Sequence, residues 1–372
     1  MSQPIIDWVD VRAKFPVTSR SVYLNTAAAG PLAESTAKAG QLYYEQMMND
    51  GDVHWDEWLA RCEEIRKQVA AFINAEPEEI GFTTNTSSGM NLIVDALEKH
   101  GEVISCDLEF PVTTIPWMHR RIPVHFVKSV GGVVRPEDVG AAMNTRTGII
   151  SMSYVQFSNG FRSDLEELAG VKGKHALVVN ASQAAGAFEI DVKRTKIDAL
   201  CSTGHKWMRS GYGSGFVYIS KELQAASRQR TIGWLSVHDP YGMRNDEIHL
   251  RHDVASRAEI GCLHFAGVFA LGASVELMQS IGIENIQTRA LELNRKLTSR
   301  LDEIGWKVLS PLGEEKFRSA ETLVAAENPA TLVHQLAQQN ILVTEKPQGI
   351  RVSTDFFNNK DDIESLIRNL SV

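Results

Sequence analysis

The sequence predicts an α/β protein: a large domain built on a mainly parallel central sheet, followed by a smaller α+β C-terminal domain. Two observations support this fold class. Between about residues 60 and 250, short apolar runs alternate with helical or loop segments, which is typical of strands buried on both faces of a parallel sheet. In the last hundred residues, two long helical patterns precede several short strands, which is an α+β order. The length of 372 residues allows two domains.

The individual elements follow from hydrophobic spacing. Residues 56–74 form the first long helical pattern, because apolar side chains recur on one helical face. The other predicted helices cover residues 90–97, 265–281, 285–304 and 360–370. The predicted strands cover residues 103–105, 124–127, 148–155, 176–179, 200–201, 216–219, 306–309, 322–326, 341–344 and 350–353. We therefore expect a large domain over residues 20–255 and a small domain made of residues 1–19 and 256–372.

Composition and charge exclude several classes of protein. The chain is 43% hydrophobic and 23% charged, close to globular averages, which argues against a disordered or collagen-like chain. Its net charge of −8 argues against general binding to nucleic acid. No stretch approaches the roughly 20 apolar residues of a membrane span, and the N-terminus lacks the pattern of a signal peptide. We expect a cytoplasmic enzyme or small-molecule-binding protein, with neither nucleic acid nor membrane as a partner.

The four cysteines do not indicate a metal site. Cys62, Cys106, Cys201 and Cys262 are widely spaced, and no pair has the Cys-x-x-Cys spacing of zinc or redox sites. The first three fall in apolar patterns, which predicts buried, reduced thiols.

Two polar clusters follow predicted strands, where ligands bind in parallel α/β sheets. Residues 83–89 hold five hydroxyl side chains and a glycine before a helix, an arrangement that suits a phosphate; ordinary helix capping would also explain it. Lys206 follows the strand at 200–201 and is flanked by Gly204, His205 and Trp207. A lysine there could bind a carbonyl cofactor covalently, or it could be a solvated loop residue.

Two further features point to the same chemistry. Asn180 and Gln183 follow the strand at 176–179 and could contact a ring nitrogen and a ring hydroxyl, or they could serve a turn. Arg351 could hold a carboxylate with two hydrogen bonds, or it could be a surface arginine. A phosphate cradle, an aldehyde-capturing lysine, partners for a heteroaromatic ring and a carboxylate clamp are together what pyridoxal phosphate and an amino acid need.

On these residues the chain resembles the fold type I enzymes that depend on pyridoxal 5′-phosphate, specifically the aminotransferase class V family. That family includes cysteine desulfurases, cysteine/cystine lyases, kynureninases and isopenicillin N epimerases. The resemblance extends from residues 23–30 to residues 351–353, and its most specific motifs are residues 202–207, 211–213 and 180–186. It implies the fold type I transferase fold and pyridoxal phosphate as the cofactor.

The resemblance implies a set of cofactor-binding residues. They are Thr86, Ser87, Phe110, Asn180, Gln183, Thr203, His205 and Lys206. Lys206 is the implied catalytic residue, which forms the Schiff base and moves the α-proton of the substrate. Thr86 and Ser87 are implied to bind the cofactor phosphate, and Thr203 and His205 complete that cradle.

The remaining roles concern the ring, the substrate and a second subunit. Phe110 is implied to stack on the pyridine ring, Gln183 to lie near the ring hydroxyl, Arg351 to pair with the substrate α-carboxylate, and Asn25 to reach the substrate side. Residues 232–234 and 259–262 resemble segments that reach a neighbouring subunit's site. The resemblance therefore implies a homodimer with shared active sites and a small amino acid as substrate.

Two departures from the family pattern shape the expected reaction. Asn180 stands where the family has Asp, and a neutral amide cannot keep the ring nitrogen protonated by its charge. A weaker electron sink disfavours transamination more than elimination or racemisation.

Residues 343–349 lack the reactive cysteine that desulfurases carry before the carboxylate-binding arginine. We expect a lyase acting by β-elimination at a C–S bond, or an epimerase, rather than a desulfurase. The alternatives are an aminotransferase, or a protein that binds pyridoxal phosphate with little turnover.

Overall fold

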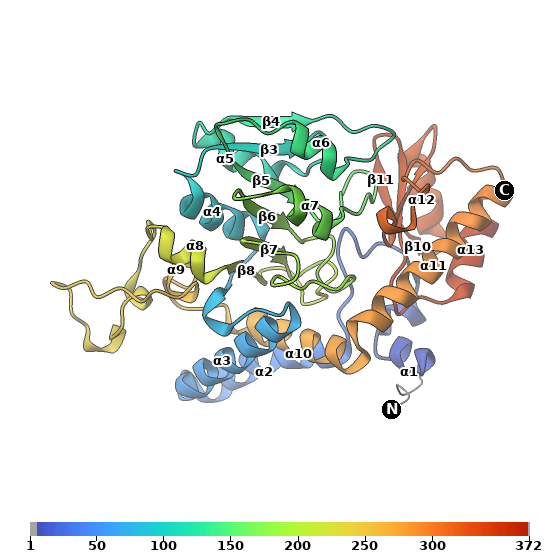
Figure 1. Cartoon of the computed structure of the whole chain (residues 1–372). Helices are drawn as coiled ribbons and strands as arrows, with labels where there is room; N and C mark the ends of the chain where they lie inside the picture. Colours follow the sequence, from blue (N-terminus) through green and yellow to red (C-terminus); the bar gives the residue numbers. More distant parts are fainter. Residues whose placement is uncertain (1–5, 371–372) are drawn as a thin grey trace, which may run out of the picture.

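The central feature of the structure is a seven-stranded sheet with strand order β2-β8-β7-β6-β5-β3-β4 (Figure 1). The structure is a computed structural model, and it describes residues 6–370. The strands of this sheet are β2 (Ile80–Phe82), β3 (Glu102–Cys106), β4 (Val124–Val127), β5 (Thr147–Ser153), β6 (Ala176–Asn180), β7 (Ala199–Thr203) and β8 (Gly215–Ile219). Only β8 runs against the others, because it pairs antiparallel with both β7 and β2.

The central strands are rich in apolar residues because both faces of the sheet are covered. Every residue of β5, β7 and β8 is buried, as expected for a parallel sheet between two layers of helices. The helices of this part are α2 (Glu34–Asp50), α3 (Trp55–Phe72), α4 (Thr86–Leu97), α5 (Ile115–His119), α6 (Pro136–Ala141), α7 (Leu165–Val171), α8 (Lys221–Ala226), α9 (Ala255–Ala258) and α10 (Phe265–Ile281). The helix α4 packs on β7 and β8, and α10 packs on α2 and α3.

A second, smaller sheet lies toward the C-terminus, with strand order β11-β12-β9 and antiparallel pairing. Its strands are β9 (Glu321–Ala325), β11 (Thr344–Lys346) and β12 (Gly349–Ser353). The short strands β1 (Val22–Tyr23) and β10 (Ile341–Leu342) pair in parallel beside it. The helices of this part are α11 (Ile283–Glu303), α12 (Pro329–Gln338) and α13 (Lys360–Leu370), and a short helix α1 (Trp8–Ala13) precedes the large sheet. Leu293, Leu297, Ile350 and Leu366 belong to a separate apolar cluster here.

Most of the predicted elements are present. The six strands predicted between residues 103 and 219 correspond to β3–β8, and the α/β class with a mainly parallel sheet is confirmed. The prediction of a strand at residues 306–309 is wrong, because a single bridge from Val308 to Val324 is all that this segment forms. The domain division after residue 255 stays a prediction. The helix α10 lies beyond that point and nevertheless packs on α2 and α3.

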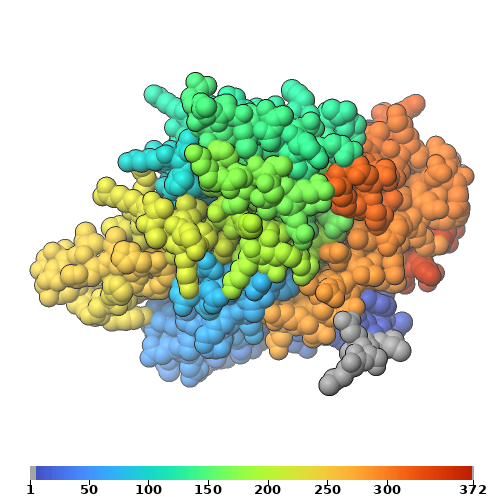
Figure 2. Space-filling view, in the orientation of Figure 1, coloured from blue at the N-terminus to red at the C-terminus, as the bar shows by residue number. Residues whose placement is uncertain are grey.

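One segment extends away from the rest of the molecule. Residues 227–254 form a long excursion without α-helix or strand, which protrudes on the side opposite the C-terminal elements (Figures 1 and 2). Its exposed apolar side chains are Ile232, Trp234, Tyr241, Met243 and Ile248. Within residues 6–370 no single helix is long and apolar enough to cross a membrane; only the pair α10 and α11, bent by 80°, reaches that length and composition together.

A buried ion pair joins the two sheets. Arg209 follows β7, Asp355 follows β12, and Nε of Arg209 donates to Oδ2 of Asp355 at 3.0 Å. Both side chains are almost completely buried. The guanidinium carbon of Arg209 also lies 4.3 Å from the ring centroid of Phe356. This cluster connects the loop after β7 with the loop after β12.

Removing one partner of this pair should be costly. In Asp355→Ala the guanidinium of Arg209 stays buried without a counter-charge, so we expect the free energy of unfolding to fall by about 3–5 kcal/mol. Urea denaturation followed by circular dichroism measures this. The double variant Arg209→Met/Asp355→Leu should lose less, and the exposed change Glu64→Ala should lose much less. A loss in Asp355→Ala no larger than in Glu64→Ala would show that the pair does not join the two parts.

Candidate active site

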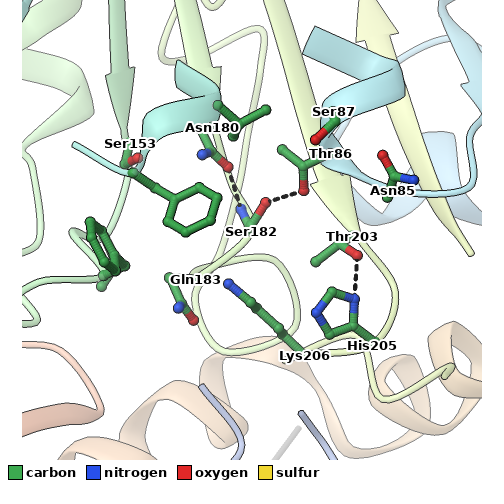
Figure 3. A pocket seen from close by; sticks show the side chains of 14 residues that line it. Asn85, Thr86, Ser87, Ser153, Asn180, Ser182, Gln183, Thr203, His205 and Lys206 are labelled. Atoms are coloured by element: carbon green, nitrogen blue, oxygen red, sulfur yellow. Dashed lines mark hydrogen bonds between the residues drawn. The ribbon is translucent and has the colours of Figure 1, made fainter. Parts of the chain in front are cut away.

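One cavity lies at the carboxyl edge of the large sheet, where the strands β3, β5, β6 and β7 and the segment after β2 end (Figure 3). It encloses about 180 Å³. Its lining residues are Asn85, Thr86, Ser87, Phe110, Val112, Ser153, Val155, Phe157, Asn180, Ser182, Gln183, Thr203, His205 and Lys206. All eight residues predicted to bind the cofactor are in this set. Parallel strands bring them together, because their carboxyl ends share one edge of the sheet.

The first turn of α4 forms one wall of the cavity. The side chain of Asn85 caps the helix by accepting from the backbone N–H of Ser88 at 3.0 Å. The backbone N–H groups of Thr86 and Ser87 have no acceptor within the helix, since a first turn lacks one. The hydroxyl of Thr86 lies 2.6 Å from that of Ser182. This wall therefore offers free N–H donors and hydroxyls, which is a suitable environment for a phosphate.

The loop after β7 contributes the opposite side of this cradle. Oγ1 of Thr203 and Nδ1 of His205 are hydrogen-bonded at 2.7 Å, and the His205 ring stacks on Tyr212 with centroids 4.4 Å apart. Burial and the positive charge of Lys206 lower the pKa of His205 to about 4, so the ring is neutral at pH 7. In the tautomer in which Thr203 donates to Nδ1, Nε2 carries the proton and is a donor.

Lys206 extends into the cavity between Gln183 and His205 (Figure 3). Its Nζ donates no hydrogen bond to any residue of the described chain and lies 5.7 Å from the ring centroid of Phe110. Burial and the nearby charge of Arg351 lower the pKa of Lys206 and Glu321 raises it, with a net pKa of about 8. A substantial fraction of the amine is therefore neutral near pH 8, and a neutral amine is a nucleophile toward an aldehyde.

Asn180, at the end of β6, has a fixed orientation. Its Oδ1 accepts from the backbone N–H of Ser182 at 3.1 Å, and an N–H can only donate, so the amide nitrogen must be on the other side. There Nδ2 donates to Oγ1 of Thr113 at 3.0 Å. Nδ2 carries a second hydrogen, for which the described residues offer no acceptor. Asn180 therefore presents a donor to the cavity.

Gln183 and Phe110 border the same space. Nε2 of Gln183 donates to the carbonyl of Ala27 at 3.0 Å, and its Oε1 accepts from the indole of Trp207 at 2.8 Å. Phe110 is 43% exposed and contacts Phe157 edge to face, with centroids 5.1 Å apart. One face of the Phe110 ring is thus free to cover a flat ligand.

The two predicted substrate-binding residues lie on the small sheet and the N-terminal segment rather than in the cavity lining. Arg351 is buried on β12; its Nη1 is 3.4 Å from the carbonyl of Phe157 and 3.4 Å from the carboxylate of Glu321. Its Nε is buried without a partner among the described residues. Oδ1 of Asn25 accepts a hydrogen bond from Thr344 of β11. Both residues therefore lie beside strands that approach the cavity near Phe157.

Sequence reasoning missed several polar residues around this site. Glu109 is half-buried and accepts from the backbone of Ser153 at 2.6 Å and from Gln156 at 2.6 Å; removal of its carboxyl from water raises its pKa. Glu321, the buried neighbour of Arg351, also has a pKa raised by burial. Neither carries a local sequence signal, because each is defined by partners far away in the chain. No group of three or more metal-ligating side chains lies together within residues 6–370.

The comparisons with known proteins agree with this geometry. The family model of the class-V aminotransferases matches residues 22–368, so the chain belongs to that family, whose enzymes use pyridoxal phosphate. A probable cysteine desulfurase of Methanothermobacter thermautotrophicus is 29% identical over 79% of this chain and 76% of that protein. The isopenicillin N epimerase of Amycolatopsis lactamdurans is 24% identical over 96% of each chain. The structure of a cysteine desulfurase from Thermococcus onnurineus NA1 superimposes with a TM-score of 0.89 and 23% identity, over 100% of this chain and 98% of that one.

The predicted family, fold and cofactor class are thereby confirmed, and the cavity itself fits the cofactor. The first-turn N–H groups of Thr86 and Ser87 suit its phosphate, the unpartnered amine of Lys206 its aldehyde, and the exposed face of Phe110 its ring. The role of each individual residue stays a prediction.

The lowered pKa of Lys206 predicts how uptake of the cofactor depends on pH. Only the neutral amine attacks the aldehyde, so the rate of binding should rise as pH increases through about 8, the pKa of Lys206. An ordinary lysine, with a pKa near 10.4, would give a midpoint about two units higher. Stopped-flow absorbance of the apoprotein mixed with pyridoxal phosphate, from about pH 6 to about pH 11, measures the midpoint and includes that of an ordinary lysine.

Two variants test the cause of this dependence. Lys206→Ala should show no covalent absorption band and no fixation of the cofactor by borohydride. Arg351→Gln removes a positive charge that lowers the pKa of Lys206, so its midpoint should move upward. A rate in the parent protein that keeps rising to a midpoint near 10.4 would contradict the burial of Lys206.

Proposed function

We propose that this protein binds pyridoxal phosphate in the described cavity and acts on an α-amino acid, as a lyase that eliminates across a C–S bond or as an epimerase. The observation that carries the proposal is the position of the Lys206 amine. It has no hydrogen-bond partner in the described chain, it lines the same cavity as the donor-rich first turn of α4, and it is close enough to Arg351 for that charge to lower its pKa. A cofactor phosphate and a substrate carboxylate would thus both lie near one nucleophilic amine.

In this proposal each group of residues has a separate role. The bound cofactor supplies an aldehyde for the substrate amine and a ring that withdraws electrons from Cα. Thr86, Ser87 and Thr203 hold the phosphate, and Phe110 covers the ring and excludes water. Arg351 orients the substrate by its α-carboxylate. Nζ of Lys206, once released, takes the proton from Cα and returns it.

The surroundings of the cavity favour these reactions over persulfide formation. Its described lining residues include no cysteine. Cys62, Cys106 and Cys201 are buried, and burial raises the pKa of the Cys62 thiol to about 12. A reactive thiol needs a lowered pKa and access to the substrate. The exposed Cys262 lines a different cavity, beside Thr84 and Ser88.

The amide of Asn180 favours the proposed elimination or epimerisation over the first alternative, which is transamination. A donor facing the ring nitrogen leaves that nitrogen unprotonated, and a neutral ring stabilises charge at Cα less strongly. Elimination and epimerisation tolerate a short-lived carbanion better than transamination does. The second alternative, a protein that binds the cofactor with little turnover, has the same cavity and differs only in its response to amino acids.

We also propose the homodimer with shared active sites that the sequence implies. The protruding residues 227–254 expose Ile232 and Trp234, and several large exposed apolar side chains on one segment are typical of an interface. Residues 259–262 line a cavity next to Ser88 of α4. A second copy that contacts this region would reach the phosphate end of the site. The cytoplasmic location stays a prediction from the sequence.

Product analysis tests the proposed reaction. The protein loaded with pyridoxal phosphate should release a 2-oxo acid with ammonia from one sulfur-containing amino acid, or interconvert the two epimers of an amino acid, without an added amino acceptor. In Arg351→Gln substrate affinity should fall by about 2–5 kcal/mol, because a charge-assisted pair is lost, whereas cofactor retention should not change. Chiral chromatography and calorimetry measure the two effects.

The alternatives give different results in the same assays. Product that forms only when a second 2-oxo acid is supplied would identify an aminotransferase. A protein whose visible spectrum responds to no amino acid would be a binding protein. Conversion of Cys262 to a persulfide by L-cysteine would favour desulfurase chemistry.

The role of Asn180 has its own test. If its Nδ2 donates to the pyridine nitrogen, the nitrogen of bound ¹⁵N-labelled cofactor should be unprotonated in the parent protein and protonated in Asn180→Asp. The chemical shift of that nitrogen in NMR measures this directly. The Asp variant should also gain transamination as a side reaction. A protonated nitrogen in the parent protein would contradict this account.

A further inference from the structure

The small sheet presents one row of polar side chains toward the cavity. In the β11–β12 pair Thr344 lies opposite Arg351. Lys346 is two residues beyond Thr344, and alternate residues of a strand lie on the same face. Lys346 and Arg351 are therefore diagonal neighbours on one face, a placement whose Cα atoms are typically about 7–8 Å apart. Glu321 lies on the same face, because on β9 it is two residues from Leu323, the partner of Arg351.

The side chain of Lys346 points to the edge of the cavity. Its Nζ lies 4.6 Å from the ring centroid of Phe157, which is a lining residue. The side chain is half-buried. Burial and the charge of Arg351 lower the pKa of Lys346 and the charge of Glu321 raises it, with a net pKa of about 8. Lys346 thus remains largely charged at pH 7 although it is partly removed from water.

Lys346 forms no close ion pair within the described chain, although the charge of Glu321 acts on it from farther away. Among residues 6–370 no carboxylate lies within 4.0 Å of its Nζ, and the amine donates no hydrogen bond. The partly buried Lys172, in contrast, pairs with Asp198 at 2.5 Å. A half-buried ammonium without a counter-charge is costly, and such groups are normally paired.

The charges around this face are unequal in number. Two cationic groups of this face, those of Arg351 and Lys346, act on one buried carboxylate, that of Glu321, and the amine of Lys206 is not counted because the cofactor would take it up. A substrate α-carboxylate on Arg351 supplies one further negative charge. Glu321 and that α-carboxylate would both lie on Arg351, so the ammonium of Lys346 would still be without a paired carboxylate on the neighbouring strand.

We propose that Lys346 determines substrate specificity by binding a second anionic group, at the end of the substrate side chain. The substrate class is then an acidic α-amino acid whose side chain ends in a carboxylate or a sulfur oxyacid. The inference rests on the proposed function, because it assumes that Arg351 holds the α-carboxylate. The sheet register, the contact with Phe157 and the missing counter-charge support it.

Unreactive carboxylates test this without turnover. The protein loaded with pyridoxal phosphate is titrated calorimetrically with glutarate and with pentanoate, which have the same carbon number but two charges and one charge. The parent should bind glutarate at least about 10-fold more tightly, the gain expected from one charge-assisted hydrogen bond. Lys346→Met should lose this preference for glutarate, with pentanoate affinity unchanged within about 2-fold. Lys346→Arg should keep it.

Matched variants exclude general effects. Lys128→Met removes the same charge from an exposed position and should leave both affinities unchanged. If Lys346→Met does not fold, Lys346→Gln keeps a polar side chain without the charge, and it should lose the preference for glutarate in the same way. A melting temperature equal to that of the parent confirms that each variant is folded.

Three results would overturn the inference. An equal loss for glutarate and pentanoate in Lys346→Met would place the amine on the α-carboxylate. If neither affinity changes in Lys346→Met, Lys346 is a structural residue that packs on Phe157. If the parent protein does not prefer glutarate over pentanoate, the site does not bind a second anionic group. The proposed function fails separately, if no amino acid of any charge alters the visible spectrum of the loaded parent protein.

Discussion

The geometry of the site depends on the buried pair of Arg209 and Asp355. Lys206 lies three residues before Arg209, and Arg351 lies four residues before Asp355. The lysine belongs to the loop after β7 of the large sheet, and the arginine belongs to β12 of the small sheet. A guanidinium that is buried between them, with two hydrogen bonds to one carboxylate, fixes distance and orientation together. The two groups proposed to hold the cofactor and the substrate are thus positioned by one interaction.

Burial then gives this arrangement its chemistry. The same removal from water that makes the Arg209 pair rigid lowers the pKa of Lys206 and raises the pKa of Glu321. A lysine on the surface would be protonated and inert toward an aldehyde at neutral pH. The excess of cations over anions around Glu321 has a second effect, since it lowers the energy of any anionic ligand that enters.

The sequence was sufficient for the parts of the fold that depend on local pattern. The strands β3–β8 consist of apolar runs, and α10 and α13 were predicted with the bounds that the structure shows. The eight cofactor-binding candidates share one cavity because each ends or follows a strand, which is itself a local feature. The segment at residues 306–309 is apolar enough for a strand, but it bridges β9 only at Val308. Apolar spacing alone cannot distinguish a segment that forms a strand from one that forms a single bridge, because a strand needs a continuous partner strand.

The polar residues that sequence reasoning missed share a different property. Glu109, Glu321 and Lys346 acquire their chemistry from neighbours in three dimensions: Ser153 for the first, and Arg351 for the other two. Single charged residues in a sequence are usually solvated, so nothing local distinguishes them. Register supplies the missing information, because it decides which side chains of β9, β11 and β12 share a face.

Asn180, with its neutral amide, and the two cations Arg351 and Lys346 act on different stages of the proposed reaction. In the proposed function Asn180 acts on the cofactor ring, where it would influence how long negative charge can remain at Cα. Arg351 and Lys346 act on the substrate, where they would influence which amino acid enters. Asn180 is on the large sheet and the two cations are on the small sheet, and none of the hydrogen bonds described for Asn180 involves Arg351 or Lys346. Selection of the reaction and selection of the substrate are therefore separable in this fold, and a change in one need not alter the other.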